Sequence, residues 1–486
     1  MHRERLLRFG FLREVMKGWL ISSDPGTQDG DSTPWHASFW EFCARYCEQR
    51  FDAAWHLSPA QSLLLHADST VVPAQVVVHS PKGANNRIDL PFGTSLYDLK
   101  EEEVPHASDM TKRDGLRLYS QAAALVRVSG SFISRNPVET RVVLANVADV
   151  GEISRLLLLG GHSVVAGRLA GAFRRVGRDD DADEMLSVMR AAGYDVREKD
   201  PFTPEQPSIK LAASPHPLVG RLKAMWEAMR GHVIESFPDP PGRPVDHESY
   251  LRAVDDIYQS DAYHSLSIEG YRVSPSLIER VASGNWNPED SAADRASRDA
   301  LSARGYWVAF QRVRRDIAKI IDGAEPADLV RRSHREWYRE LFEPCVAAGL
   351  IGAPALSGYR NDAVYLRTSR YVPPRWEAVI DAMETVFELL SVEPEPCVKA
   401  VLGHWLLGYI HPYPDGNGRI ARFLMNAMLA SGGYPWTVIR VSDRESYLAA
   451  LDSASIDQEI GPFARFVADR VRWSRASQFG VSRLRP

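Results

Sequence analysis

A stretch of twelve residues, from His411 to Arg422, constrains this chain more than any other part of its sequence. Apolar residues recur at helical spacing before it, from Cys397 to Ile410, and after its first half, from Ile420 to Met428. The first helix should end near Pro412, because proline cannot continue a helix and disfavours helical geometry in the preceding residue. Gly432 and Gly433 supply a natural stop for the second helix. The sequence therefore predicts two buried helices joined by a polar, glycine-rich loop.

The loop, residues 411–419, has the composition of a phosphate-binding site. Gly416 and Gly418 allow consecutive backbone N–H groups to face an anion. The first turn of the following helix adds unpaired N–H donors and a favourable dipole. Arg419 and Arg422 lie three residues apart and hence on one helical face, where each can bind a phosphate oxygen. We interpret the loop as an anion site at a helix N-terminus.

Two further loop residues supply chemistry. Asp415 offers a hard carboxylate of the kind that Mg²⁺ prefers when it also holds nucleotide phosphates. His411 can accept a proton near neutral pH. The run Gly416–Ala421 also matches the dinucleotide fingerprint Gly-x-Gly-x-x-Ala, but that fingerprint follows a strand and here a helix precedes it. A plain turn between helices would explain any one of these residues, whereas their combination indicates phosphoryl or nucleotidyl transfer.

The fixed positions of this stretch resemble the signature of the Fic family of protein-modifying enzymes: His411-Pro412-Tyr413-x-Asp415-Gly416-Asn417-Gly418-Arg419-x-x-Arg422. Family members usually carry Phe where this chain has Tyr413, a conservative change that should still anchor the loop in the core. The resemblance implies an all-helical domain that transfers AMP from ATP, with Mg²⁺, to a Ser, Thr or Tyr hydroxyl of a protein target. Self-modification is a further expectation.

The resemblance also implies a role for each matching residue. His411 would be the general base that deprotonates the target hydroxyl, and Asp415 would hold Mg²⁺. The phosphates would be bound by the remaining matched positions, with Asn417 also at the α-phosphate and Arg422 at the γ-phosphate: Gly416, Asn417, Gly418, Arg419 and Arg422.

Ser265-Leu266-Ser267-Ile268-Glu269-Gly270 lies upstream, at the end of a helical pattern that starts at about Asp246. It resembles the family's inhibitory motif, Ser/Thr-x-x-x-Glu-Gly/Asn, which implies that Ser265, Glu269 and Gly270 form an inhibitory element. In the family this glutamate pairs with the second arginine of the signature, here Glu269 with Arg422. The Glu269 carboxylate would then take the place of the γ-phosphate. Such a charge-assisted pair contributes roughly 1.5–3 kcal/mol, enough to suppress productive binding about tenfold to a hundredfold.

Residues 358–374 are expected to form a short β-hairpin, with its turn at Asn361-Asp362 and strand character from Val364 to Leu366. The hairpin resembles the family's flap, which clamps a target segment by strand addition. The candidate target-contacting residues are Tyr359, Arg360, Val364 and Tyr365. A surface loop is the alternative interpretation.

Composition divides the chain into three parts. Residues 1–200 are expected to form a regulatory or recognition region of mixed helix and strand. Residues 201–245 are expected to form a proline-rich linker with one helix from about Val219 to Ile234. For residues 246–486 the resemblance implies a Fic domain with its inhibitory helix. The predicted fold class is mainly α, with an α+β N-terminal region.

The N-terminal region carries a weaker signal. The segment Leu6–Ile21 could form the edge of a winged helix, and the segment from Leu57 to His66, together with the strand after it, is weakly similar to AbiEi-like antitoxins. Those proteins bind DNA, so basic residues near the N-terminus would contact phosphates, namely Arg5, Arg8, Arg13 and Lys17. A solvated amphipathic face explains the same residues equally well, because Glu4 and Glu14 interrupt the charge.

The charge and cysteine content of the chain argue against several classes of function. The 486 residues hold 58 Lys and Arg against 63 Asp and Glu, so the net charge of -5 argues against binding nucleic acid or membrane through bulk charge. No apolar run reaches the roughly 20 residues of a membrane helix, and no signal peptide is evident. The four cysteines form no Cys-x-x-Cys pair and predict no structural zinc site. We expect a cytoplasmic protein, and a homo-oligomer remains open.

Two functional alternatives remain compatible with the residues. A Fic enzyme could transfer UMP, phosphate or phosphocholine, or remove AMP. The loop residues fix the geometry of the diphosphate, but they do not specify the nucleobase of the donor. The chain could also be a DNA-binding regulator or antitoxin with an auxiliary Fic domain.

Overall fold

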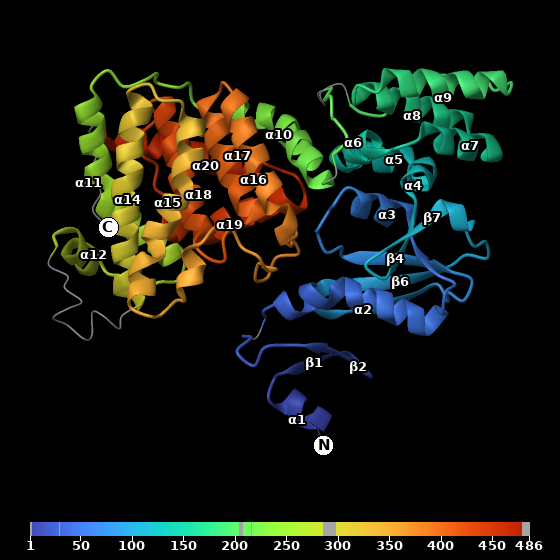
Figure 1. Ribbon diagram of the computed structural model, residues 1–486, viewed down its shortest axis with the longest axis horizontal. Helices are drawn as coiled ribbons and strands as arrows, with labels where there is room; N and C mark the ends of the chain where they lie inside the picture. The colour runs from blue at the N-terminus through green and yellow to red at the C-terminus, as the bar shows by residue number, and fades with distance from the viewer. Residues whose placement is uncertain (1, 29, 204–207, 215, 285–297, 479–486) are drawn as a thin grey trace. The chain divides into compact units, whose positions relative to one another are not determined.

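The computed structural model describes residues 2–28, 30–203, 208–214, 216–284 and 298–478. The chain divides into two compact units (Figure 1). The N-terminal unit comprises residues 1–228 and 364–373, and the C-terminal unit comprises residues 229–363 and 374–486. Helices dominate the described chain and strands are confined to its first 120 residues, which confirms the predicted fold class.

The first half of the N-terminal unit is a small α+β layer. It contains a hairpin, a four-stranded sheet in the order β3-β4-β6-β5, and a two-stranded ribbon. Among the strands of the described residues, β4 and β6 alone pair in parallel. The elements are α1 (His2–Arg8), β1 (Leu12–Met16), β2 (Trp19–Ser22), α2 (Thr33–Phe51), β3 (His56–Leu57), α3 (Pro59–His66), β4 (Gln75–Ser80), β5 (Asn86–Asp89), η1 (Pro91–Gly93), β6 (Ser95–Lys100), η2 (Ala107–Asp109), β7 (Met110–Arg113) and β8 (Leu116–Tyr119).

Helices α2 and α3 lie on opposite sides of this sheet (Figure 1). Helix α2 buries Phe39 and Cys43, one turn apart, in the same core as Val76 and Val78 of β4. Strand β4 alternates buried and half-buried residues over this stretch, as expected for a strand with one face on a core. The sheet is therefore held by the apolar stripe of a single long helix on this face.

Six helices complete the N-terminal unit around a second apolar core. They are α4 (Gln121–Arg127), α5 (Gly130–Arg135), α6 (Pro137–Asn146), α7 (Val150–Gly160), α8 (Ser163–Arg175) and α9 (Asp179–Ala191). Helix α10 (Pro217–Ser236) follows, at the position of the helix predicted within the proline-rich stretch, and its residues are shared between the two units.

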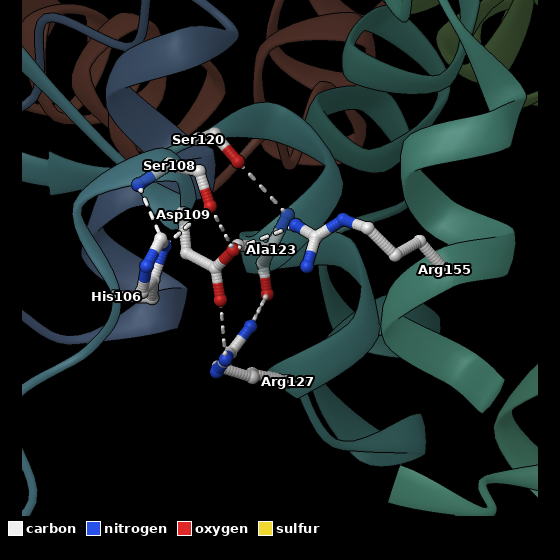
Figure 2. A network of polar contacts seen from close by, with 7 residues as sticks. All are labelled: His106, Ser108, Asp109, Ser120, Ala123, Arg127 and Arg155. Carbon is white, nitrogen blue, oxygen red and sulfur yellow. Dashed lines mark hydrogen bonds and ion pairs between the residues drawn. The ribbon is translucent and has the colours of Figure 1, made fainter. Parts of the chain in front are cut away.

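Asp109 connects the strand layer to these helices (Figure 2). Its buried carboxylate accepts hydrogen bonds from Arg155 of α7 at 2.8 Å and from Arg127 of α4 at 3.0 Å. Its backbone carbonyl accepts from the N–H of Ser120 at 2.7 Å. Burial by itself would raise the pKa of Asp109, but the two guanidinium groups outweigh it and hold that pKa below the usual value.

The C-terminal unit is helical throughout its described residues, apart from connecting segments. After the end of α10 it contains α11 (His247–Ile268), α12 (Pro275–Ala282), α14 (Arg298–Ile321), α15 (Pro326–Ala347), η3 (Ala353–Leu356), η4 (Trp376–Ala378), α16 (Val379–Val392), α17 (Pro396–Ile410), α18 (Asn417–Ser431), η5 (Val441–Asp443), α19 (Arg444–Ile456) and α20 (Gly461–Gln478). Helices α17 and α18 are buried on almost every side; α17 is apolar all round, whereas α18 also buries polar and charged side chains such as Arg419 and Arg422.

The boundaries of α17 and α18 follow the sequence signals. Helix α17 ends at Ile410, two residues before Pro412, and α18 ends at Ser431, directly before Gly432. Both predicted ends are confirmed.

Tyr413 anchors the loop between these helices, as predicted. Its ring is completely buried and stacks on Tyr338 of α15 at 4.0 Å between ring centroids. The Tyr413 hydroxyl has no hydrogen-bond partner among the described residues, whereas the Tyr338 hydroxyl donates to the carbonyl of Ala355 at 3.0 Å. Aromatic burial, rather than hydrogen bonding of the phenol, therefore holds the loop in the core.

The predicted β-hairpin at residues 358–374 is wrong, because every residue of this segment is described and none is in a strand. Its backbone groups bind elsewhere: the N–H of Arg360 donates to Pro412, and the carbonyl of Arg370 accepts from Val72 at 2.8 Å. Residues 364–373 belong to the N-terminal unit, where Val372 packs against the core of the sheet.

None of the described helices is long and apolar enough to cross a membrane.

We predict that Asp109→Asn lowers the free energy of unfolding of the N-terminal unit by about 2 kcal/mol near neutral pH. This loss is smaller than for a fully buried ion pair, because the side chains of Arg127 and Arg155 are 33% and 44% exposed. The Asp109 carboxyl has a lowered pKa in the folded state, so its contribution is present above the ordinary value of 3.8 and lost as the pH falls through the folded value. Urea denaturation at about pH 7 and about pH 3 should show the cost shrinking in acid. Asp195→Asn, at an exposed position in the same unit, should have no effect at either pH.

We predict that Tyr413→Phe leaves the C-terminal unit equally stable or stabilises it by about 1 kcal/mol, because it removes a buried hydroxyl without a partner. Tyr338→Phe is the matched control and should destabilise by about 1 kcal/mol, because it leaves the Ala355 carbonyl without its donor. A loss of stability in Tyr413→Phe as large as in Tyr338→Phe would contradict this account of the loop.

Candidate active site

His411 occupies the first position after α17, in a left-handed backbone conformation with φ of 52°. This conformation turns the chain out of the helix before Pro412, where helical geometry is disfavoured. The Nδ1 atom of His411 lies 3.3 Å from the carbonyl oxygen of Gly408. Because a carbonyl can only accept, Nδ1 carries the proton in this contact, which leaves Nε2 with a free lone pair. The helix end thus presents an imidazole in the tautomer that a general base requires.

Arg360 fixes the backbone at this helix end. It is buried, and its Nε donates to the carbonyl of His411 at 2.8 Å. Its Nη1 donates to Asp362 at 2.8 Å and its Nη2 to Ile410 at 3.3 Å and to Pro374. Sequence reasoning placed Arg360 on a target-binding flap, but a buried side chain that binds four backbone carbonyls is a support of the loop.

The loop is braced from within by Asn417. Its side-chain oxygen accepts from the Tyr413 N–H at 2.9 Å, and its side-chain nitrogen donates to the Tyr413 carbonyl at 2.7 Å. Both polar ends of the amide therefore help to fix the loop, and the backbone N–H of Asn417 lies in the first turn of α18. Gly416 has φ of 80°, and a Cβ there would come within 2.7 Å of the Phe342 ring. No other residue type fits this turn without displacing Phe342.

Arg419 is buried yet makes no hydrogen bond to any described residue through its guanidinium nitrogens. Its Nη2 atom lies 3.5 Å from Oδ2 of Asp415. The guanidinium lies 5.2 Å from the ring centroid of Tyr271 and 4.9 Å from that of Phe342. The two rings hold the group in place by cation–π contact while its N–H donors stay unsatisfied. A buried cation with unsatisfied donors is costly, and an anionic ligand would satisfy them.

Arg422, one turn further along α18, contacts the end of α11. Its Nη2 forms an ion pair with the Glu269 carboxylate at 2.7 Å, and its Nε donates to the Ser265 hydroxyl at 2.9 Å. The Ser265 carbonyl also accepts from Nη2 at 3.2 Å. Helix α11 ends at Ile268, Glu269 is its C-cap residue, and Gly270 follows with φ of 88°. The motif that the sequence singled out on α11 thus meets the second arginine of the loop motif.

The Glu269 carboxylate also lies against the glycines of the loop. A Cβ on Gly418 would come within 2.4 Å of the Glu269 Oε1 atom. The carboxylate therefore occupies the space directly above Gly418, where the chain offers its helix N-terminus to an anion.

The electrostatics of the site keep its groups in useful protonation states. Burial lowers the pKa of His411, against the opposing hydrogen bond to Gly408 and the charge of Glu269. Burial alone would raise the pKa of Glu269, but the charges of Arg422 and Arg419 hold it below the usual value. At neutral pH the imidazole is therefore neutral and the carboxylate is ionised.

Asp415 carries the carboxylate of the loop that could hold a metal ion. It is half-exposed, and its Oδ1 accepts from the Gly416 N–H at 2.6 Å. Its Oδ2 faces Arg419 at 3.5 Å and is open to solvent. A hard, accessible carboxylate oxygen beside an anion site fits Mg²⁺ when that ion is also bound by phosphates.

The predicted residues do not all come together. His411, the loop, Arg419, Arg422 and the α11 motif form one site within the C-terminal unit. Tyr359 lies beside it, and its hydroxyl donates to Nε2 of His334 at 2.8 Å, because Nδ1 of His334 donates to the Val330 carbonyl. Val364 and Tyr365 belong instead to the segment grouped with the N-terminal unit.

Sequence reasoning missed the two rings that hold Arg419. Tyr271 directly follows the α11 motif, a position that could have drawn notice, but Phe342 reads as an ordinary apolar residue of α15.

Residues 326–429 match the model of the Fic/DOC family. The chain is 32% identical over 253 residues to Protein adenylyltransferase Fic of Nematostella vectensis, a match that covers 51% of this chain and 55% of that protein. It is 33% identical over 113 residues to Protein adenylyltransferase fic-1 of Caenorhabditis elegans, covering 22% of each chain. The chain thus spans about half the length of the first of these relatives.

Among solved structures, Fic-1 (aa134–508) from C. elegans aligns with a TM-score of 0.39 at 20% identity, covering 70% of this chain and 92% of that chain. A TM-score this low does not by itself establish a shared fold. The family match does not depend on it: residues 326–429 contain α15, α16, α17, the loop and nearly all of α18. The match to the Fic/DOC family model therefore covers the loop and the helices on both sides of it.

Proposed function

We propose that this chain is a protein adenylyltransferase, which transfers AMP from ATP to a Ser, Thr or Tyr hydroxyl of a protein target and is inhibited by its own Glu269. The observation that supports it most is Arg419: a buried guanidinium, clamped between two rings, whose N–H donors have no hydrogen-bond partner among the described residues. A nucleotide phosphate supplies the anionic oxygens that these donors lack. The names of the relatives, both called protein adenylyltransferase, support AMP as the transferred group.

In this proposal His411 is the general base. The target hydroxyl oxygen attacks the α-phosphorus of ATP while its proton passes to the Nε2 atom of His411. The bond from the α-phosphorus to the bridging oxygen breaks, and pyrophosphate leaves with the bonding electrons. The Gly408 carbonyl holds the imidazole in the tautomer that can accept this proton, and Arg360 fixes the backbone that carries it.

The loop and the start of α18 bind the phosphates in this proposal. The backbone N–H groups of Asn417 and Gly418 belong to the first turn of α18 and have no intrahelical acceptor. The guanidinium groups of Arg419 and Arg422 add positive charge beside the phosphates. Asp415 would hold Mg²⁺, which supplies charge neutralisation of the phosphates when it is bound.

Glu269 would inhibit by occupying the γ-phosphate position. Its carboxylate pairs with Arg422 at 2.7 Å and covers Gly418, so a phosphate and this carboxylate compete for the same donors. Because the side chain is only 26% exposed, the pair is partly shielded from solvent and is stronger than a surface ion pair. Release requires the end of α11 to move or the glutamate to be replaced.

We predict that Glu269→Gly and Glu269→Gln each raise the transfer of label from ATP to protein by about tenfold to a hundredfold, because each removes the charge that competes for Arg422. His411→Ala in the Glu269→Gly background should abolish transfer while ATP still binds. Mass spectrometry of the protein, incubated with ATP and Mg²⁺, measures the added mass and any self-modified hydroxyl.

Glu248→Gln is the matched control for charge loss, because Glu248 is an exposed glutamate on the same helix α11, and it should leave the basal transfer unchanged. Equal transfer in wild type and both Glu269 variants would refute inhibition. A strong preference for UTP or another donor over ATP would overturn the AMP assignment and favour a different transferred group. Salt-dependent binding of the chain to its own promoter DNA, unchanged by His411→Ala, would favour a regulatory role instead.

We predict that kcat/KM of Glu269→Gly rises with pH and levels off with a midpoint below 6.5, the ordinary pKa of histidine, because burial lowers the pKa of His411 in the free enzyme. The base is neutral above its folded pKa and is lost by protonation below it. The Glu269 charge raises the pKa of His411, so its removal should move the midpoint further down. Initial rates across a pH series measure this, and a midpoint above 6.5 would contradict His411 as the buried base.

A further inference from the structure

Three potential metal ligands meet at one end of the sheet in the N-terminal unit. His56 lies on β3 and His79 on β4, and the two are direct cross-strand partners. Glu101 follows β6 immediately, and its N–H donates to the carbonyl of Ser80 at 3.1 Å. Because β3, β4 and β6 are adjacent in the sheet, the three side chains lie at the same end of it.

The ligating atoms of these residues converge. The Nδ1 atom of His79 lies 2.5 Å from Oε2 of Glu101, and Nε2 of His56 lies 3.9 Å from the same oxygen. One ligand atom from each residue lies within 4.8 Å of the other two. Two ligands of a tetrahedral zinc ion are separated by about 3.3 Å, given bonds of about 2.0–2.1 Å, so an ion fits after small side-chain rotations.

His56 is held in the state that a metal requires. It is 4% exposed, and its Nδ1 lies 3.2 Å from the backbone carbonyl of Leu57, which can only accept. The proton is therefore on Nδ1, and the Nε2 lone pair points toward the Glu101 side. Metal-ligating histidines usually donate their second ring N–H to a carbonyl or carboxylate in this way. Burial also lowers the pKa of His56, which keeps the imidazole neutral.

The charges around the cluster leave room for a cation. The nearest cationic group that acts on His56 is Arg127, which is paired with Asp109 at 3.0 Å and stacks over the Tyr119 ring at 5.0 Å. The same Tyr119 ring packs edge-on against His56 at 4.9 Å. Glu101 is 41% exposed, so an ion can reach the cluster from solvent through the carboxylate side.

We propose that His56, His79 and Glu101 bind a divalent transition-metal ion of the Zn²⁺ class. Two imidazole nitrogens and one carboxylate oxygen make three protein ligands, which leaves a fourth position for water or another donor. The ion would link β3, β4 and the residue after β6, and so stabilise one end of the sheet. This site is independent of the chemistry proposed for the C-terminal unit.

Metal entry replaces the hydrogen bond between His79 and Glu101. To bind the ion through Nδ1, a neutral His79 must carry its single ring proton on Nε2 instead.

The test uses the full chain without an affinity tag, freed of metal by a chelator and titrated with Zn²⁺ by calorimetry. Co²⁺ is a second probe, because a tetrahedral site gives it strong visible absorption. We expect one ion per chain and a higher thermal unfolding midpoint on binding. His79→Ala and Glu101→Gln should each weaken binding by at least about tenfold and remove the thermal shift.

His162→Ala and Glu103→Gln are the matched controls, because both residues are exposed in the same unit, and both variants should bind as wild type does. Circular dichroism of each metal-free variant checks that loss of binding does not come from loss of folding, and the half-exposed Glu101 is the position least able to disturb the core. Binding by wild type only at millimolar Zn²⁺, or equal binding by the site and control variants, would overturn the proposal.

Discussion

Two buried guanidinium groups, those of Arg419 and Arg422, govern the C-terminal unit. A buried cation is costly unless a counter-charge or hydrogen bonds compensate it. Arg422 obtains both from Glu269 and Ser265, whereas Arg419 has only ring faces and a carboxylate at 3.5 Å. The difference creates a site that is ready for an anion at one arginine and blocked by an internal carboxylate at the other. We therefore propose that nucleotide binding and self-inhibition have the same cause, which is the need of these two buried guanidinium groups for an anionic partner.

Contacts to its backbone and to the Tyr413 ring hold the loop between α17 and α18 in place. Arg360 binds the carbonyls around the end of α17, Asn417 bridges both backbone groups of Tyr413, and the Tyr413 ring is locked against Tyr338. A loop held this way can present N–H donors in fixed positions without reorganising when a phosphate arrives. Arg360 therefore matters for the geometry of His411 although it does not face the site itself.

The N-terminal unit follows a different construction. Polar clusters support its strands: Asp109 binds two arginines of the helices that follow, and His56 meets His79 and Glu101 at one end of the sheet. Residues 364–373 join this unit although the chain on both sides of them belongs to the other. A strand pattern such as Val364–Leu366 satisfies its backbone with whatever partner the tertiary structure offers, so local propensity did not decide its state.

The sequence by itself determined the ends of α17 and α18, the burial of Tyr413, and the identity of the loop residues, because proline, glycine and helical periodicity act over a few neighbouring positions. Only the tertiary structure decided that Arg360 is a buried brace, that Tyr271 and Phe342 enclose Arg419, and that His56 meets His79 and Glu101. These contacts join residues far apart in the chain. Strand pairing and helix packing set them, and no local pattern records which distant side chains will share a buried space.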